Sequence, residues 1–204
     1  EDPRSVRTGN PAEYRTREHK FLRLSDFQDY LQDFIDRLEG TENARNQPRE
    51  WIEGELQDLC ITRDMDWGID YPAGDEEGET AEDLVLYVWV DAPIEYVSST
   101  RQYSERVGTD EYDWETVWKP GGQRRLGTAW DSDWTDECGE IIHVIGADII
   151  QHHCVFWPAM LRGAGYSEPR AVLATGFVGI DGKSLSTSRN RAIWASEYLD
   201  TGFH

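Results

Sequence analysis

The stretch from His143 to Met160 contains residue types that could bind a nucleotide next to a small pocket. It joins an apolar strand pattern to a helical pattern through the turn Gly146-Ala147-Asp148. In an open parallel sheet, ligands bind beyond the carboxyl end of such a strand. Gly146 lets a ligand approach the backbone closely, and Asp148 either caps the helix or accepts hydrogen bonds from a ribose. Alone, this junction is typical of many nucleotide-binding folds.

Six residues from two segments could line an apolar pocket with two polar handles: Trp89, Ala92, Pro93, Tyr96, Ile149 and His153. A tryptophan at a strand end and a tyrosine on a helix are core residues more often than not, so the pattern leaves a purely structural role open. Phe156 and Trp157 are expected to support the pocket. His143 and His152 are expected to be structural histidines with satisfied hydrogen bonds. A metal cluster at residues 152–154 is not expected, because adjacent helical positions point in different directions.

The elements that position these residues alternate between strand and helix. Apolar runs predict strands over residues 84–90, 140–145 and 172–177, the first of them a buried parallel strand. One helix is expected to begin at Asp91, with Asp91 as its cap and Pro93 in its first turn, and another over 148–162. This order predicts an α/β fold with a doubly wound parallel sheet, because crossovers between parallel strands are right-handed. A hairpin turn at Asp181-Gly182 and a helix over 192–199 follow.

The N-terminal third is expected to be helical and to carry no chemistry of its own. Ser25 and Gln28 form a capping-box pattern for a helix that ends at Gly40, and Pro48 is expected to open a second helix. Residues 108–138 are rich in Trp, Asp and Gly without sustained periodicity, and they are expected to form a surface insertion.

Composition limits the classes of protein to which the chain can belong. Its net charge is −20, from 40 acidic and 20 basic residues, with 38% hydrophobic residues interleaved among them. This argues against a disordered acidic tail, and it leaves an ordinary acidic protein or one adapted to high salt. The widely spaced Cys60, Cys138 and Cys154 form no C-x-x-C pair, which predicts neither a zinc site nor a disulfide framework and suits a reducing cytoplasm. No apolar run is long enough to predict a membrane span.

Two further segments give these features a family context. They are Leu86-Tyr87-Val88-Trp89-Val90-Asp91-Ala92-Pro93-Ile94-Glu95-Tyr96 and the run from Thr175 to Asn190. In this order and spacing, the segments resemble the second half of the catalytic domain of methionyl-tRNA synthetases, which are class I aminoacyl-tRNA synthetases. The resemblance implies three parts: the end of a connective insertion (1–66), the second half of a Rossmann-like domain (67–178), and the start of the stem-contact region (179–204).

The resemblance also implies roles for individual residues. The six pocket residues match those that line the methionine pocket, where the tyrosine hydroxyl approaches the sulfur. Gly146 and Asp148 match positions that contact the ribose. The family's second signature, Lys-Met-Ser-Lys-Ser, aligns with Ser184-Leu185-Ser186-Thr187-Ser188, so both lysine positions are lost. The residues expected to serve ATP binding or catalysis are Gly146, Asp148, Lys183, Leu185, Ser186, Thr187, Ser188 and Arg189, of which Lys183 and Arg189 flank the loop and could supply charge.

The implied reaction is activation of methionine with ATP and Mg²⁺, followed by transfer to tRNA(Met), in the cytoplasm and without membrane or DNA. The family's first signature, His-Ile-Gly-His, is absent from these residues. We therefore expect the isolated chain to be inactive, and we expect zinc only in a part of the connective insertion that this chain lacks. Two alternatives stay open: a sister class I synthetase for another apolar amino acid, and a non-catalytic nucleotide-binding or scaffold relative.

Overall fold

The computed structural model describes residues 3–6, 8–12, 16–72, 80–120, 140–187 and 190–202. The chain divides into two compact units, one formed by Glu1–Arg23 and Gln57–Glu95 and the other by Leu24–Leu56 and Tyr96–His204. Each unit is described by itself. The expected divisions after residues 66 and 178 stay predictions, because compactness divides the chain on a different basis.

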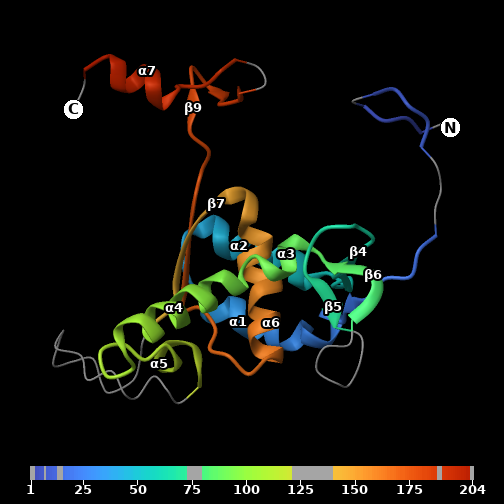
Figure 1. The fold of residues 1–204 in the computed structure, drawn as a ribbon, viewed down its shortest axis with the longest axis vertical. Coiled ribbons are helices and arrows are strands. Elements are labelled where there is room, and N and C mark those ends of the chain that lie inside the picture. The colour runs from blue at the N-terminus through green and yellow to red at the C-terminus, as the bar shows by residue number, and fades with distance from the viewer. Residues whose placement is uncertain are drawn as a thin grey trace. The chain divides into compact units, whose positions relative to one another are not determined.

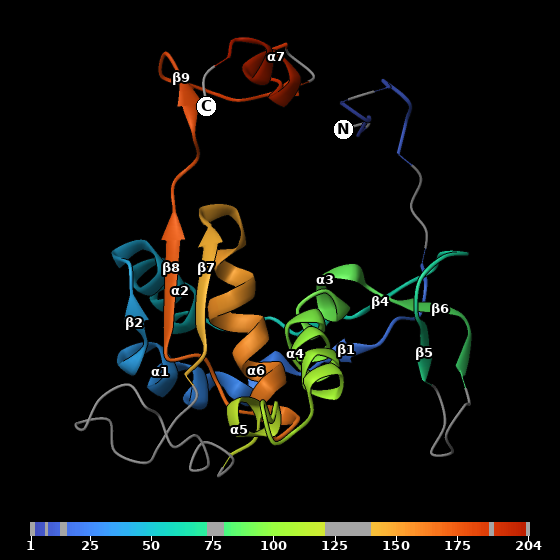
Figure 2. The same ribbon diagram turned by 60° about the vertical axis from the view of Figure 1, so that its left-hand side comes forward.

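The larger unit is built on a parallel sheet, which confirms the predicted α/β class. Its strands are β2 (Glu39–Gly40), β8 (Ala171–Thr175) and β7 (Ile142–Gly146), in that order (Figure 2). Gly146 pairs with Thr175, so the carboxyl ends of β7 and β8 meet at one edge. Two of the predicted strands are therefore confirmed to within a few residues, whereas the two-residue strand β2 was not predicted.

Helices α1 (Gln28–Arg37), α2 (Glu42–Glu53) and α6 (Trp157–Gly163) lie around these strands (Figure 1). The turn after β7 continues as a 3-10 helix over Ala147–Ile149 and a π-helical segment over His152–Phe156, which runs into α6. The main core joins the helices to one face of the sheet, with these residues among its members: Leu31, Phe34, Ile35, Ile52, Ile150, Cys154, Val172 and Ala174. The predicted helix over 148–162 is thus present, with a π-helical turn in its middle.

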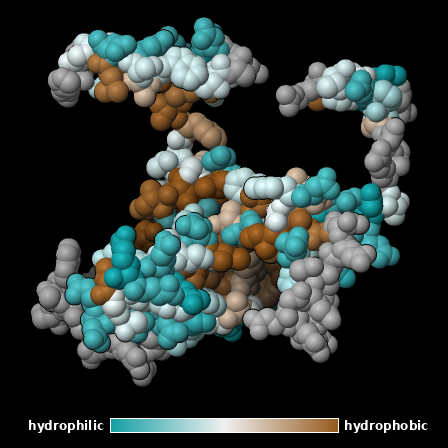
Figure 3. Space-filling view, in the orientation of Figure 1, coloured by the Kyte–Doolittle hydropathy of each residue, from teal (hydrophilic) through white to brown (hydrophobic). Residues whose placement is uncertain are grey.

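The opposite face of the parallel sheet exposes apolar side chains. Ile142 is 51% exposed and Val144 is 70% exposed, while His143 and Ile145 between them are buried. Figure 3 shows hydrophobic surface over β7 and β8. Parallel sheets are usually covered on both faces. This face, in contrast, is uncovered among the described residues.

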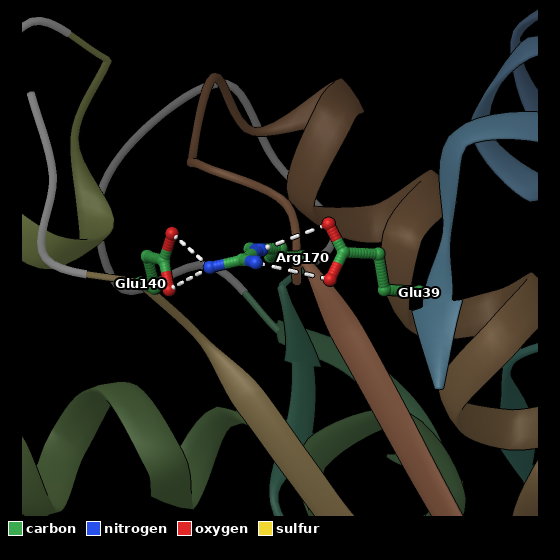
Figure 4. Close-up of polar contacts among 3 residues, drawn as sticks. All are labelled: Glu39, Glu140 and Arg170. Atoms are coloured by element: carbon green, nitrogen blue, oxygen red, sulfur yellow. Dashed lines mark hydrogen bonds and ion pairs between the residues drawn. The ribbon is translucent and has the colours of Figure 1, made fainter. Parts of the chain in front are cut away.

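A charged clamp joins the three strands at their N-terminal ends. The guanidinium group of Arg170 donates to both carboxylate oxygens of Glu39, over 3.1 and 3.0 Å, and to the carboxylate of Glu140 on its other side (Figure 4). These hydrogen bonds raise the pKa of Arg170 and lower that of Glu39. Because the Arg170 and Glu39 side chains are about half exposed, we expect the clamp to set strand register more than overall stability.

In the N-terminal part the first predicted helix is present, whereas the capping-box role of Gln28 and the helix start at Pro48 are wrong. The chain enters α1 through a 3-10 turn at Leu24–Phe27, and α1 has no side-chain cap. The Gln28 side chain instead bonds three backbone groups in the last turn of α2 and just after it: it donates to the carbonyls of Ile52 and Gly54 and accepts from the amide of Leu56. Pro48 lies inside α2, because the helix buries Ala44, Pro48 and Ile52 along one face.

The described part of the expected surface insertion is partly buried. Helix α4 (Ile94–Val107) ends just before this region, helix α5 (Glu115–Trp118) lies within it, and Trp118 is only 3% exposed. It packs in a second core with Ile141, Trp157 and Leu161. Residues 108–120 are therefore not simply a surface segment, and residues 121–139, with Cys138, lie outside the described part.

The smaller unit corrects the first predicted strand. Strand β6 (Thr80–Leu86) pairs antiparallel with β4 (Thr62–Arg63) and β5 (Asp70–Pro72), and a separate pair joins β1 (Phe21–Leu22) to β3 (Leu59–Cys60). The predicted parallel strand over 84–90 is therefore wrong. Its second half is the short helix α3 (Val88–Asp91), in which Asp91 is the last residue and not a cap.

The C-terminal elements agree with the sequence. A hairpin joins β9 (Gly179–Ile180) to β10 (Lys183–Ser184), with Asp181 at φ 50° and Gly182 at φ 71° in its turn. These positive φ values match the predicted tight turn. Helix α7 (Ala195–Asp200) covers the C-terminal part of the predicted helix over 192–199 and ends one residue beyond it. None of the helices in the described ranges is both long and apolar enough to cross a lipid bilayer.

Candidate functional site

The centre of the candidate site is a hydrogen bond between Tyr96 on α4 and His153 in the π-helical segment. The Tyr96 hydroxyl lies 2.9 Å from His153 Nε2, and His153 Nδ1 lies 3.0 Å from the carbonyl oxygen of Ile149. A carbonyl only accepts, so His153 Nδ1 carries a proton. Burial lowers the pKa of His153 and favours the neutral ring. In that ring Nε2 is the acceptor, so the tyrosine donates to the histidine.

Other aromatic rings enclose this pair. The His143 ring centroid lies 5.0 Å from that of Tyr96 and 5.1 Å from that of His153. Trp157 meets Tyr96 edge-on at 6.3 Å, and His152 lies 5.5 Å from His153. His153 is 3% exposed whereas Tyr96 is 37% exposed. The tyrosine therefore has one side against a buried aromatic cluster and another open to a ligand.

The two neighbouring histidines, His143 and His152, are buried as expected, but the hydrogen bonding of His143 differs from the expectation. Burial, followed by repulsion from His153, lowers the pKa of His143 and of His152 to about 4. His143 Nε2 is buried and has no hydrogen-bond partner within the described part of the chain. His143 is thus not the satisfied structural histidine that we expected, and it contacts both members of the central pair. The alternation along β7, which buries His143 with Ile145, is the sequence signal that could have identified it.

The turn after β7 places Gly146 and Asp148 at the carboxyl edge of the sheet. A Cβ atom on Gly146 would lie 2.6 Å from Asp148 Oδ1, so the carboxylate folds over the glycine. Asp148 is exposed, and the helix that begins here has no side-chain cap. The capping role is therefore wrong, and the ribose contact stays a prediction. Phe156, which we expected to support the pocket, packs against His152, with 6.1 Å between the ring centroids.

The six residues expected to line one pocket fall in both compact units. Tyr96, Ile149 and His153 belong to the larger unit, where the Ile149 side chain also packs on the main core. Trp89, Ala92 and Pro93 belong to the smaller unit: Trp89 is 46% exposed in α3, and Pro93 is buried. The structure brings Tyr96, Ile149 and His153 together, whereas the assembly of all six residues stays a prediction.

The loop aligned with the second signature begins at the hairpin. Lys183 is exposed on β10, and Ser186 pairs with Arg191 through two backbone hydrogen bonds of 2.7 and 2.9 Å. Leu185 is 40% exposed, and the Thr187 carbonyl accepts from the amide of Asn190. Ser188 and Arg189 lie outside the described residues. The exposed Lys183 and the paired Ser186 are compatible with a phosphate-binding loop, which stays a prediction.

A separate cavity of about 630 Å³ lies at the other end of the parallel strands, where Arg37 and Glu168 form an ion pair beside Tyr30. It contains none of the predicted site residues. Across the described ranges, no cluster of His, Cys, Asp and Glu is arranged to hold a metal ion.

A parallel sheet with helices around it defines an open α/β fold, a class in which ligands bind at the carboxyl edge of the sheet, where the glycine–aspartate turn lies here. The chain belongs to the class I tRNA synthetase family, since the family model described as "tRNA synthetases class I (M)" matches residues 1–204. The resemblance drawn from the two sequence segments is thereby confirmed.

Individual relatives agree with this assignment. The chain is 76% identical to a methionine–tRNA ligase of Haloarcula marismortui and 68% identical to one of Halobacterium salinarum, over its full length. It is also similar to a crystal structure of Mycobacterium tuberculosis methionyl-tRNA synthetase bound by methionyl-adenylate, with 29% identity and a TM-score of 0.65 over 98% of this chain and 34% of that one. The chain spans 28% of the Haloarcula relative and 27% of the Halobacterium one.

Proposed function

We propose that this chain forms part of the amino-acid activation site of a methionyl-tRNA synthetase. In that reaction the methionine carboxylate attacks the α-phosphate of ATP, which yields methionyl-adenylate and pyrophosphate, and the methionyl group then passes to tRNA(Met). The observation that carries the proposal is the Tyr96–His153 hydrogen bond, which lies in the unit whose β7 ends at the Gly146–Asp148 turn. This combination supports the proposal of a side-chain site and a nucleotide site in the same unit.

The chemistry of the aromatic cluster suits a thioether. A thioether is long, polarizable and only a weak hydrogen-bond acceptor, so an aromatic wall with one polar group matches it. In the free protein Tyr96 donates its hydroxyl proton to His153. The sulfur, which has no proton to donate, would lie against the Tyr96 ring and hydroxyl oxygen by van der Waals contact. Trp89, Ala92, Pro93 and Ile149 would complete the pocket. Shape would then reject branched side chains, at about 1–3 kcal/mol for each misplaced methylene.

The nucleotide would lie along the carboxyl edge of the sheet. Asp148, which is exposed and caps no helix, would accept hydrogen bonds from the ribose hydroxyls, and Gly146 would allow the nucleotide to approach the backbone closely. Lys183 and Arg189 would contact the phosphates of Mg²⁺-bound ATP, with Ser186 and Ser188 as hydrogen-bond donors and Leu185 and Thr187 completing the loop. No covalent enzyme intermediate is needed, because such a site works by positioning and by stabilising the leaving pyrophosphate.

One observation favours a second candidate function. Both lysine positions of the second signature carry uncharged residues, Ser184 and Thr187. A relative that binds nucleotide without forming an adenylate would tolerate this loss. We rank it second, because the exposed Lys183 supplies a positive charge one residue before the signature.

The experiment uses the intact protein that contains this chain, in molar potassium chloride. Its ATP–pyrophosphate exchange is measured with methionine, leucine, isoleucine, valine and cysteine in turn. We expect exchange that depends on methionine. Equal or better exchange with another of these amino acids would replace the proposal with a sister synthetase, and nucleotide binding without any exchange would replace it with the non-catalytic relative.

The isolated 204 residues serve as a matched comparison in the same assay. The first signature is absent from them, so we expect no exchange above the background without enzyme. Appreciable methionine-dependent exchange by the isolated chain would show that the first signature is dispensable, and it would contradict the proposed division of the site.

A further inference from the structure

His143 is a buried polar residue next to the candidate site that the proposed function does not use. It is the second residue of β7, is 6% exposed, and points to the same side of the sheet as Ile145. Its ring is in contact with the rings of Tyr96 and His153, whose centroids lie 5.0 and 5.1 Å away. No hydrogen bond reaches its Nε2 within the described residues. The packing of its ring against these two partners is therefore the feature from which a role can be inferred.

The geometry of Tyr96 explains why such a face matters. The hydrogen bond to His153 fixes the hydroxyl oxygen and the helix backbone fixes the Cβ end, yet the ring plane can still rotate about the axis between these two points. Tyr96 is 37% exposed, so solvent borders part of the ring and cannot hold it. A second contact from the buried side restricts the ring plane, and His143 provides it at a shorter centroid distance than Trp157 does, 5.0 against 6.3 Å.

His153 is oriented in a different way. Its two nitrogens bond the Ile149 carbonyl and the Tyr96 hydroxyl, which already define the plane of its ring. His143 meets it edge to face, with 64° between the planes, an arrangement that aromatic rings prefer. The same ring therefore packs against both partners of one hydrogen bond.

We propose that His143 is a positioning residue of the methionine site, which holds the Tyr96 ring in the plane where its hydroxyl bonds His153. This inference rests on the proposed function, and it adds a residue to which the family resemblance gave no role. Burial keeps His143 uncharged, since its pKa is lowered to about 4. An uncharged ring can stay buried next to Tyr96 and His153, where a charge would have to give up its hydration.

The experiment compares three variants of the intact protein in the exchange assay. His143→Leu keeps a similar volume and removes the ring, whereas His143→Phe keeps a ring and removes both nitrogens. His152→Leu is the matched control, because His152 is equally buried at 7% exposed and has the same lowered pKa, and its ring contacts are with His153 and Phe156.

We expect His143→Leu to raise the KM for methionine about tenfold, which corresponds to about 1.4 kcal/mol. The KM for ATP and the kcat should change by less than about twofold, since ring positioning affects binding of the amino acid. His143→Phe and the control should stay within about threefold of the unmodified protein, because a ring remains against Tyr96 in both.

Three results would overturn the inference: an unchanged KM for methionine in His143→Leu, an equal increase in His152→Leu, or the same loss in His143→Phe as in His143→Leu. If His143→Leu does not fold by circular dichroism, His143→Gln takes its place with the same expected result. Absence of methionine-dependent exchange in the unmodified protein would instead refute the proposed function, so the two failures are distinguishable.

Discussion

At the scale of single residues, the Tyr96–His153 hydrogen bond joins positions that are 57 residues apart. Sequence motifs could nominate both residues, because each lies in a segment with recognisable spacing. The direction of the hydrogen bond could not be predicted in this way. It follows from the Ile149 carbonyl, which requires a proton on His153 Nδ1 and leaves Nε2 as the acceptor.

The buried histidines predict a pH dependence of stability. In the unfolded chain each titrates near pH 6.5, whereas in the folded protein the pKa of His143 and of His152 is about 4. Between these values the unfolded chain binds protons that the folded protein excludes. Stability is therefore fully present above about pH 6.5 and falls as the pH drops toward 4, on the order of 3 kcal/mol for each ring.

The measurement is chemical denaturation of the intact protein at pH 7.5, 6 and 5, at constant molar salt. A variant with both His143→Leu and His152→Leu is the control for carboxylates that titrate in the same range. We expect a shallower pH slope in the double variant. Equal slopes in the two proteins would show that these rings titrate normally.

At the scale of elements, apolar runs identified strands but not their partners. The predictions for β7 and β8 succeeded because each strand leads into a recognisable turn. The prediction for residues 84–90 failed because an apolar run is equally compatible with an antiparallel strand that ends early, as β6 does at Leu86. The prediction that Pro48 opens a helix failed for a similar reason. Local rules place proline at a helix start, whereas tertiary packing here keeps it inside α2.

The turn after β7 provides a test of the nucleotide site. Gly146→Ala would place a Cβ 2.6 Å from Asp148 Oδ1, so the carboxylate would have to rotate away. Because Asp148 is exposed, we expect little change in the melting temperature and an increase of about tenfold in the KM for ATP, the cost of one hydrogen bond to a ligand. Gly54→Ala is the control, since its nearest neighbour would be 3.5 Å away. An unaltered KM for ATP would remove Asp148 from the nucleotide site.

The hairpin that carries Lys183 provides a second test. The chain has three lysines, Lys20, Lys119 and Lys183, and Lys20 is exposed in the other compact unit. If Lys183 replaces a signature lysine, Lys183→Met should lower the kcat of exchange by about 10²-fold, because it removes charge stabilisation at the leaving pyrophosphate. Lys20→Met is the control and should be silent. Equal activities of the two variants would assign the phosphate contact to another residue.

At the scale of the whole molecule, the net charge of −20 predicts dependence on salt. Self-repulsion destabilises a compact acidic chain, and salt shortens its range to about 3 Å at 1 M. The named Haloarcula and Halobacterium relatives come from salt-adapted archaea, which agrees with that interpretation. We expect the melting temperature of the intact protein to rise steadily between about 0.1 M and about 3 M potassium chloride.

Sucrose at matched osmolality is the control, because it favours burial without screening charge. An equal melting temperature at both salt concentrations would contradict an adaptation to salt. Binding of tRNA also depends on salt, because counterion release weakens phosphate binding as salt rises, whereas an acidic surface repels phosphate more strongly at low salt.

The described residues also present a face to which the rest of a longer protein could contribute. The chain spans about 28% of its Haloarcula relative, and Ile142 and Val144 expose their side chains on one face of the parallel sheet. No sequence pattern within the chain could reveal this exposure, because alternation along β7 looks the same whether or not a face is covered. The functional unit is therefore best tested as the intact protein.

The most direct test of the proposed methionine site is the variant Tyr96→Phe in the intact protein, with the KM for methionine as the measurement. The hydrogen bond to His153 orients the Tyr96 ring that we place against the methionine side chain, so its loss should raise the KM for methionine by about 10- to 100-fold, or about 1.4–2.7 kcal/mol. Tyr103→Phe on the same helix is the control, because Tyr103 is 43% exposed and packs against Tyr112 instead. A KM for methionine that is the same in Tyr96→Phe and in the unmodified protein would contradict the central claim.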